Sequence, residues 1–186
     1  PAGVINILCG KTQEIGAALT GSAVVRKHSF TGPTAVGKML TAACASTMKR
    51  TSMELGGNAP FIIFADANLE AALDGLMASK FRNSGQTCVC ANRVLIAEEI
   101  TDQFTQMLVD RLSKSVIGNG LSQGTTIGPL IQKNAVAKVQ GLVAKAIEQG
   151  ATPVNPPHET PSAGNFVPPL ILKDVTADME IFDAEI

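Results

Sequence analysis

The hydrophobic and polar positions of this chain alternate between a period typical of strands and a period typical of helices. Short runs rich in β-branched or aromatic residues predict strands at residues 3–9, 23–30, 51–55, 59–65 and 93–97. Apolar positions three and four residues apart predict helices at residues 12–21, 34–47, 68–85, 101–115 and 133–150. Strands that alternate with helices in this way favour an α/β fold with largely parallel sheets.

The end of the chain departs from this alternation. Residues 152–165 have the composition of a Pro-rich surface loop, and prolines interrupt the apolar run at residues 166–175. Earlier in the chain, the pair Gly56-Gly57 is the best local point for a change of direction.

Composition and charge exclude several classes of protein. Of the 186 residues, 45% are hydrophobic and 17% are charged, which is typical of a globular domain. A net charge of −1 gives no general attraction to nucleic acid or to an anionic membrane, and neither is an expected partner. No apolar run reaches the roughly 18 residues that span a bilayer.

The cysteines and the two ends of the sequence add two expectations. Four cysteines do not resemble the dense framework of a small secreted domain, so we expect a reducing, cytoplasmic compartment. The chain opens with Pro1 in place of an initiator methionine, and no polar tail follows its last apolar residue, Ile186. We therefore expect an excised piece of a longer protein.

Two of the cysteines lie one residue apart in the polar segment FRNSGQTCVCANR, residues 81–93. They could be metal ligands, a disulfide or a reactive thiol with a neighbour. Zinc ligands usually come in pairs separated by about two to four residues, and no second pair completes a site here. His28 follows two basic residues and His158 lies in the Pro-rich loop, so the pattern favours no metal.

Cys88 follows Gly85-Gln86-Thr87, where a predicted helix ends. A thiol in such a loop can be exposed and its backbone N–H can face a ligand, which is the setting of a nucleophile. The alternative is a structural cysteine that packs as a small apolar side chain. Cys90 either packs beside Cys88 or forms a strained, reducible disulfide with it as a redox partner.

Glu54 is the best candidate for a general base. It lies within an apolar run, directly before Gly56-Gly57. Burial among apolar neighbours would make its carboxylate a stronger base. The alternative is a glutamate that is simply exposed at the end of a strand.

The segment FTGPTAVGK, residues 30–38, has the pattern of a strand, a turn and a helix start. A turn of this kind suits an anion at a helix N-terminus, including the pyrophosphate of a dinucleotide. The segment is neither G-x-G-x-x-G nor a P-loop, so a purely geometric role for its glycines remains open.

Taken together, these three segments resemble the aldehyde dehydrogenase superfamily. FTGPTAVGK is similar to the family's cofactor turn, MELGGNAP to its general-base motif and GQTC to its nucleophile motif. Their order agrees with the family, and Cys88 follows Glu54 by 34 positions. PAGVINIL at the start and IGPLI at residues 127–131 are similar as well, so the resemblance covers the whole chain.

The resemblance implies a partial aldehyde dehydrogenase fold. Residues 1–57 would form the second part of a Rossmann-like NAD(P)-binding domain, and residues 58–186 most of an α/β catalytic domain. It also implies NAD or NADP as the cofactor, a small aldehyde as the substrate and a homo-oligomer. The mitochondrial matrix is then an alternative location, if a transit peptide precedes the sequence.

The family's roles carry over to individual residues. Cys88 would be the nucleophile, and Glu54 the base that activates the deacylating water. The residues implied at the cofactor are Gly32, Pro33, Gly37, Leu55 and the ribose-binding Glu185. The family usually has serine where this chain has Pro33, which removes one hydroxyl contact to the pyrophosphate.

Within the superfamily, the segment around Cys88 is most similar to succinate-semialdehyde dehydrogenases. In that subgroup the arginine at the position of Arg82 binds the distal carboxylate of the substrate, for which a guanidinium offers a two-pronged fork. A solvated arginine at a helix end is the alternative. Glutarate semialdehyde or another aldehyde is a competing substrate, and an inactive fragment that only binds ligands or partners is a competing function.

Overall fold

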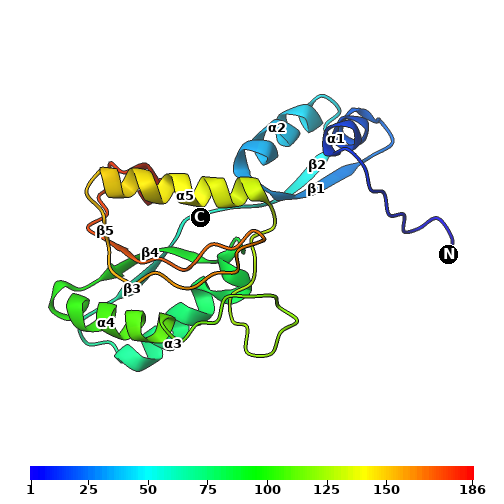
Figure 1. The fold of residues 1–186 in the computed structure, drawn as a ribbon. Coiled ribbons are helices and arrows are strands. Elements are labelled where there is room, and N and C mark those ends of the chain that lie inside the picture. Colours follow the sequence, from blue (N-terminus) through cyan, green and yellow to red (C-terminus); the bar gives the residue numbers. More distant parts are fainter. The chain divides into compact units, whose positions relative to one another are not determined.

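The computed structural model describes all residues from Pro1 to Ile186. The chain forms two compact units, Pro1–Gly57 and Asn58–Ile186, and each is described by itself (Figure 1). What each unit binds stays a prediction. No helix in either unit has the length and apolar character needed to cross a bilayer.

The first unit is built around one β-α-β motif. Its elements are α1 (Thr12–Gly21), β1 (Lys27–Gly32), α2 (Thr34–Ala45) and β2 (Arg50–Leu55). β1 and β2 pair in parallel, from Lys27 opposite Arg50 to Gly32 opposite Leu55. α2 connects the two strands and contacts both of them, and α1 packs against α2. The parallel pairing and both helices agree with the sequence pattern.

The strand predicted at residues 3–9 is wrong, because this segment has no regular structure. Its apolar side chains are open to solvent, including Ile5 and Ile7, which are 85% and 90% exposed. A β-branched run forms a strand only where another strand accepts its backbone hydrogen bonds and another layer covers its side chains. This chain supplies neither to the segment.

The second unit contains a second parallel β-α-β motif. Its elements are β3 (Ala59–Ile63), α3 (Leu69–Lys80), a 3₁₀ turn at Arg82–Gly85, β4 (Ala91–Ile96), a 3₁₀ turn at Glu98–Ile100, α4 (Thr101–Leu112), α5 (Lys133–Glu148), β5 (Thr152–Pro153), β6 (Leu172–Lys173) and α6 (Glu180–Asp183). β3 and β4 pair in parallel, whereas the two-residue strands β5 and β6 pair antiparallel.

The main core lies between the β3–β4 sheet and the helices α3 and α4. The fully buried Phe104 and Leu112 of α4 meet Leu76 of α3 and Ile63 of β3 there. Figure 1 shows the two helices together on one side of these strands, and they contact each other. Asn68 caps α3, since its side chain accepts a hydrogen bond from the backbone N–H of Ala71 at 3.1 Å.

α3 ends at Lys80, five residues earlier than the pattern predicted. Asn83, Ser84 and Gly85 follow with φ angles of 51°, 57° and 80°, in the left-handed region. Residues in this conformation cannot continue a right-handed helix, so the backbone turns sharply. That turn carries the chain from α3 into the loop that contains Cys88.

A smaller core holds the end of the chain against α5. Ala146 of α5, Ala151 and Met179 are buried together there. The prolines predicted to interrupt residues 166–175 leave only a two-residue strand, β6.

Candidate active site

Cys88 lies at the corner of a tight turn formed by Thr87–Cys90. The backbone N–H of Cys90 donates to the carbonyl of Thr87 at 3.1 Å and closes this turn. Cys88 is exposed at its first central position, and Cys90 is only 2% exposed. The turn therefore presents one thiol to solvent and holds the other inside.

Residues 82–90, here called the nucleophile loop, are bound to the segment 128–131. The Gln86 side-chain NH₂ donates to the carbonyl of Pro129 at 3.2 Å, and its oxygen accepts from the N–H of Ile131 at 2.9 Å. The Ser84 hydroxyl accepts from the N–H of Gly128 at 2.8 Å. Through these three bonds, the segment 128–131 holds the nucleophile loop in place.

Cys90 is held by one contact inside the nucleophile loop and one to the end of α3. Its sulfur lies 2.9 Å from the Thr87 hydroxyl oxygen and donates to the carbonyl of Lys80 at 3.6 Å. The Lys80 ammonium in turn donates to the Asn92 side-chain oxygen at 2.8 Å and to the carbonyl of Ile186 at 3.1 Å. Burial lowers the pKa of Lys80, and the neighbouring Cys90 opposes that shift.

Arg82 begins the nucleophile loop six positions before Cys88 and is exposed. Its guanidinium makes no hydrogen bond or ion pair. Arg93 in β4 differs, because it donates to the carbonyl of Asn58 at 2.9 Å and lies 4.8 Å over the Phe182 ring. Of these two arginines in the second unit, only Arg82 has its whole fork available to a ligand.

Glu185 is exposed on the last segment of the chain. The backbone of this segment is fixed from two sides: the carbonyl of Glu185 accepts from the Lys138 ammonium of α5 at 2.6 Å, and the carbonyl of Ile186 accepts from Lys80. The Glu185 carboxylate itself has no partner. This arrangement holds the backbone and leaves the acid free.

In the first unit, Glu54 and the predicted cofactor residues meet at one end of the β1–β2 sheet. Gly32 pairs with Leu55, and Thr31 pairs with Glu54. This is the carboxyl end of two parallel strands, where ligands of open α/β sheets usually bind. Glu54 is exposed, so the burial that we expected around its carboxylate is absent within this unit.

Gly37 and Leu55 lie in direct contact. A side chain at Gly37 would place its Cβ 2.5 Å from a methyl carbon of Leu55, so a larger residue would push Leu55 out of position. Gly32 is similar, because its Cβ would lie 2.5 Å from the Phe30 ring. Packing against Leu55 and Phe30 gives both glycines a structural role, and their place at a cofactor stays a prediction.

The N-terminus of α2 fits an anion. Its N-cap residue Pro33 makes no side-chain capping bond, and the first turn contains no acidic residue. Pro33 and Thr34 are exposed. Free backbone N–H groups at the positive end of a helix are suited to a pyrophosphate, and no carboxylate opposes it here.

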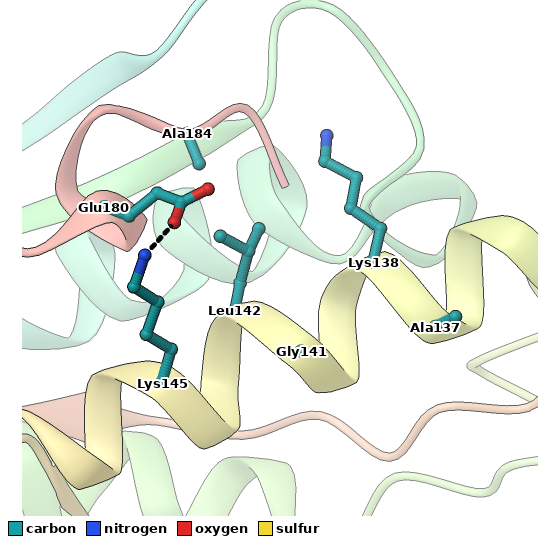
Figure 2. A pocket seen from close by; sticks show the side chains of 7 residues that line it. All are labelled: Ala137, Lys138, Gly141, Leu142, Lys145, Glu180 and Ala184. Atoms are coloured by element: carbon teal, nitrogen blue, oxygen red, sulfur yellow. Dashed lines mark hydrogen bonds and ion pairs between the residues drawn. The ribbon is translucent and has the colours of Figure 1, made fainter.

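The clearest hollow of the second unit does not involve these residues. It has a volume of about 320 Å³ and lies between α5 and the segment 180–184. Figure 2 shows Lys145 and Glu180 joined by an ion pair at its edge, with Leu142 between Lys145 and Lys138. Neither Cys88 nor Arg82 lines this hollow, so it is not the candidate active site. No group of three or more His, Cys, Asp or Glu side chains could hold a metal ion.

Lys80 and the role of Gln86 do not follow from the sequence motifs. Lys80 follows Leu73 and Leu76 at helical spacing, so the pattern places a charged residue on the buried face of α3. A charged residue on an otherwise apolar helix face is a signal from which Lys80 could have been identified. Gln86 carried no such signal, because its partners are 43 and 45 positions away in the sequence.

Comparison with known proteins assigns the family. The Aldehyde dehydrogenase family model matches residues 1–186. The chain is 48% identical to a 3-sulfolactaldehyde dehydrogenase of Pseudomonas putida and 49% identical to a succinate-semialdehyde dehydrogenase [NADP(+)] of Escherichia coli. Each match covers 100% of this chain and 38% of the relative, so the chain spans well under half of their length.

Comparison with solved structures gives the same family as comparison of sequences. The crystal structure of a succinate-semialdehyde dehydrogenase from Burkholderia pseudomallei superposes with a TM-score of 0.96 at 44% identity, over 100% of this chain and 38% of that one. The α/β elements described above thus form part of an aldehyde dehydrogenase fold. The chain belongs to the aldehyde dehydrogenase family.

Proposed function

We propose that the protein to which this sequence belongs oxidises an aldehyde with a distal anionic group to the corresponding acid, with NAD⁺ or NADP⁺. The observation that carries the proposal is the nucleophile loop. It presents an exposed thiol, Cys88, and an unpartnered guanidinium, Arg82, six positions apart on one rigidly held segment. Succinate semialdehyde is the substrate that we favour, and glutarate semialdehyde is the main alternative.

Cys88 would act as a thiolate that adds to the aldehyde carbon and converts the carbonyl oxygen into an oxyanion. The backbone N–H of Cys88 is free of other partners and can donate to that oxygen. The bonds from Gln86 and Ser84 to segment 128–131 hold the loop in place during this step. Because the loop is already held in place, the reaction does not have to spend free energy on ordering the loop.

Loss of hydride from the adduct leaves a thioester on Cys88. Bound NAD(P)⁺ would accept this hydride, and the residues that would hold it are the α2 N-terminus at Pro33, Leu55 and, at the ribose, Glu185. Glu54 would then take a proton from water, and the resulting hydroxide releases the acid from Cys88. The exposed position of Glu54 leaves its carboxylate accessible to that water.

Arg82 supports the choice of substrate class. A distal carboxylate matches the fork of a guanidinium, and the relatives named for succinate semialdehyde and 3-sulfolactaldehyde act on aldehydes with a carboxylate or a sulfonate at the far end. Both anions would satisfy an arginine that has no protein partner. The names of both relatives therefore agree with the recognition of a distal anion by an arginine.

A hydride-transfer assay tests the proposal. Reduction of NAD⁺ and of NADP⁺ would be followed at 340 nm for this chain and for the completed chain, by which we mean the same sequence extended to the length of its relatives. We expect the completed chain to oxidise succinate semialdehyde faster than an uncharged aldehyde of similar length. No reduction of either cofactor by the completed chain would refute the proposed function.

The 186-residue chain by itself has a second candidate function, that of an inactive fragment. Ile62 and Phe64 of the second unit are 55% and 68% exposed, as expected where another part of a protein would cover the sheet. Activity of the completed chain with none for the 186-residue chain would support this. Homo-oligomers and a cytoplasmic location stay predictions, and such apolar surfaces are suited to self-association.

Replacing Arg82 with alanine in the completed chain is expected to raise the KM for succinate semialdehyde by about 10- to 100-fold. The reason is the loss of a charge-assisted pair of about 1.5–3 kcal/mol. The KM for an uncharged aldehyde should change less than about threefold, because that substrate has nothing to pair with Arg82. Arg82→Lys serves as the control that keeps the charge but loses the fork. Equal losses on both substrates would indicate a structural role for Arg82.

Replacing Cys90 with alanine tests whether it is a redox partner of Cys88. A disulfide with Cys88 would remove the S–H group with which the buried Cys90 donates to the carbonyl of Lys80. We therefore expect Cys90→Ala to lose activity under mild peroxide, and to regain it with a thiol, as the parent does, through Cys88 alone. If only the parent recovers with thiol, Cys90 is the redox partner.

A further inference from the structure

Lys80 joins four segments of the second unit. It is the last residue of α3, and its backbone carbonyl accepts a hydrogen bond from the Cys90 thiol of the nucleophile loop at 3.6 Å. Its ammonium donates to Asn92 of β4 at 2.8 Å and to the backbone of Ile186, in the segment that carries Glu185, at 3.1 Å. No other cation of this unit contacts both the loop and that segment.

No side-chain carboxylate pairs with the ammonium of Lys80, whose partners are the side-chain oxygen of Asn92 and the backbone oxygen of Ile186. In the completed chain, this Ile186 oxygen belongs to a neutral peptide bond. Lys145 and Lys173 instead form ion pairs with the exposed carboxylates of Glu180 and Asp102. Burying a cation against neutral oxygens costs free energy, as the lowered pKa of Lys80 reflects. A leucine or methionine would pack on the same helix face without that cost. Packing therefore does not explain the charge, whereas holding two oxygens of distant segments does.

The loop is packed tightly around Lys80. A side chain on Gly85 would place its Cβ 3.3 Å from the Lys80 carbonyl oxygen and 3.9 Å from the Lys80 ammonium nitrogen. Gly85 also has a φ of 80°, which other residues rarely adopt. The backbone of Lys80 thus lies against Gly85, before the turn that presents Cys88, and against Cys90, the last residue of that turn.

We propose that Lys80 is a positioning residue that couples the nucleophile loop to the Glu185 segment. By holding Ile186 and contacting Cys90 and Gly85, it sets the place of Cys88 relative to the acid that would hold the cofactor ribose. Occupation of the Glu185 side by NAD(P)⁺ then changes the reactivity of the Cys88 thiol. The inference rests on the proposed function, because it uses the roles given there to Cys88 and Glu185.

The test compares Lys80→Met with Lys138→Met in the completed chain. Methionine keeps most of the apolar stem and removes the donors. Lys138 is the matched control: its ammonium also donates to the Glu185 segment, at 2.6 Å, but it lies on α5 and does not contact the nucleophile loop. Lys80→Arg, which keeps a charged donor, is the rescue variant.

Two measurements separate positioning from simple support. The first is the alkylation rate of Cys88 with and without NAD(P)⁺, and the second is kcat and the cofactor KM. We expect NAD(P)⁺ to change the alkylation rate of the parent and of Lys138→Met by at least about threefold, but that of Lys80→Met by less. We expect Lys80→Met to lower kcat at least about tenfold, since small misplacement of a nucleophile is costly. Lys138→Met should mainly raise the cofactor KM, and Lys80→Arg should recover most of kcat.

A double-mutant cycle with Glu185→Gln gives a further criterion. If Lys80 acts through the Glu185 segment, the losses of kcat/KM for the cofactor in Lys80→Met and Glu185→Gln should not multiply. Multiplying losses, or a Lys80→Met variant that behaves as Lys138→Met does, would overturn the coupling while the parent remains active. A parent without turnover would instead refute the proposed function. If Lys80→Met does not fold, Lys80→Gln replaces it in both measurements, with the same criteria.

Discussion

The completed chain with alanine in place of Cys88 is expected to lose at least about 10⁴-fold in kcat for aldehyde oxidation, because no thioester can form without the nucleophile. Cofactor binding should be unchanged, since the residues proposed to hold NAD(P)⁺ are untouched. The measurements are NAD(P)⁺ reduction with succinate semialdehyde and cofactor binding by fluorescence or calorimetry.

The other cysteines provide matched controls for this prediction. Cys44 and Cys90 are buried, whereas Cys9 is exposed like Cys88 but lies in the unstructured first segment. Cys9→Ala and Cys44→Ala should keep turnover within about threefold of the parent, as expected away from the site. A limiting amount of alkylating agent should label Cys88 first, as peptide mapping would show. The loss of turnover should be proportional to the fraction of Cys88 that is labelled. Turnover in the Cys88→Ala variant would contradict the assignment of the nucleophile.

Replacing Glu54 with glutamine is expected to lower steady-state turnover by about 10²- to 10⁴-fold, the usual contribution of a general base. Glutamine keeps the size of the side chain but cannot take a proton from water. The first turnover should persist as a burst of NAD(P)H, because the thioester still forms and only its hydrolysis is slow. Stopped-flow absorbance at 340 nm separates the burst from the steady state.

Glu14→Gln is the control for Glu54, since Glu14 is the other acidic residue of the first unit and pairs with Lys11 in α1. It should leave both phases unchanged. A Glu54→Gln variant that loses the burst together with the steady state would show that Glu54 acts before hydrolysis, at the thiol itself. Unchanged turnover would leave Glu54 as the exposed strand-end residue of the alternative interpretation.

The structure changes how the nucleophile motif is understood. The sequence suggested that the turn before Cys88 matters because it exposes the thiol. In the structure, Asn83, Ser84 and Gly85 lie shortly after the end of α3 in the left-handed region and turn the backbone toward the exposed Cys88. The Gln86 side chain then holds the loop against Pro129 and Ile131. The exposure of the Cys88 thiol thus comes from the backbone turn at residues 83–85, whereas the rigidity of the loop comes from the Gln86 side chain.

Several features followed from the sequence alone. The helical periods located α1, α2, α4 and α5 within a few residues, since an amphipathic stripe depends on local spacing. The alternation of strands and helices predicted the two parallel β-α-β motifs. The ordered motifs also identified the family, because each motif reflects a short stretch of backbone with fixed chemistry. These features depend on near neighbours in the chain, which a sequence displays directly.

Other features were decided only by tertiary structure, and each depends on residues that are distant in the sequence. The β-branched run at residues 3–9 was predicted as a strand and is not one, because a strand needs a neighbour to pair with. The burial expected around Glu54 is absent, since what covers a strand end is set by other segments. Lys80 reaches Ile186 across 106 positions. Periodicity indicates which face of a helix is buried, but only packing determines which oxygen the half-buried Lys80 ammonium contacts there.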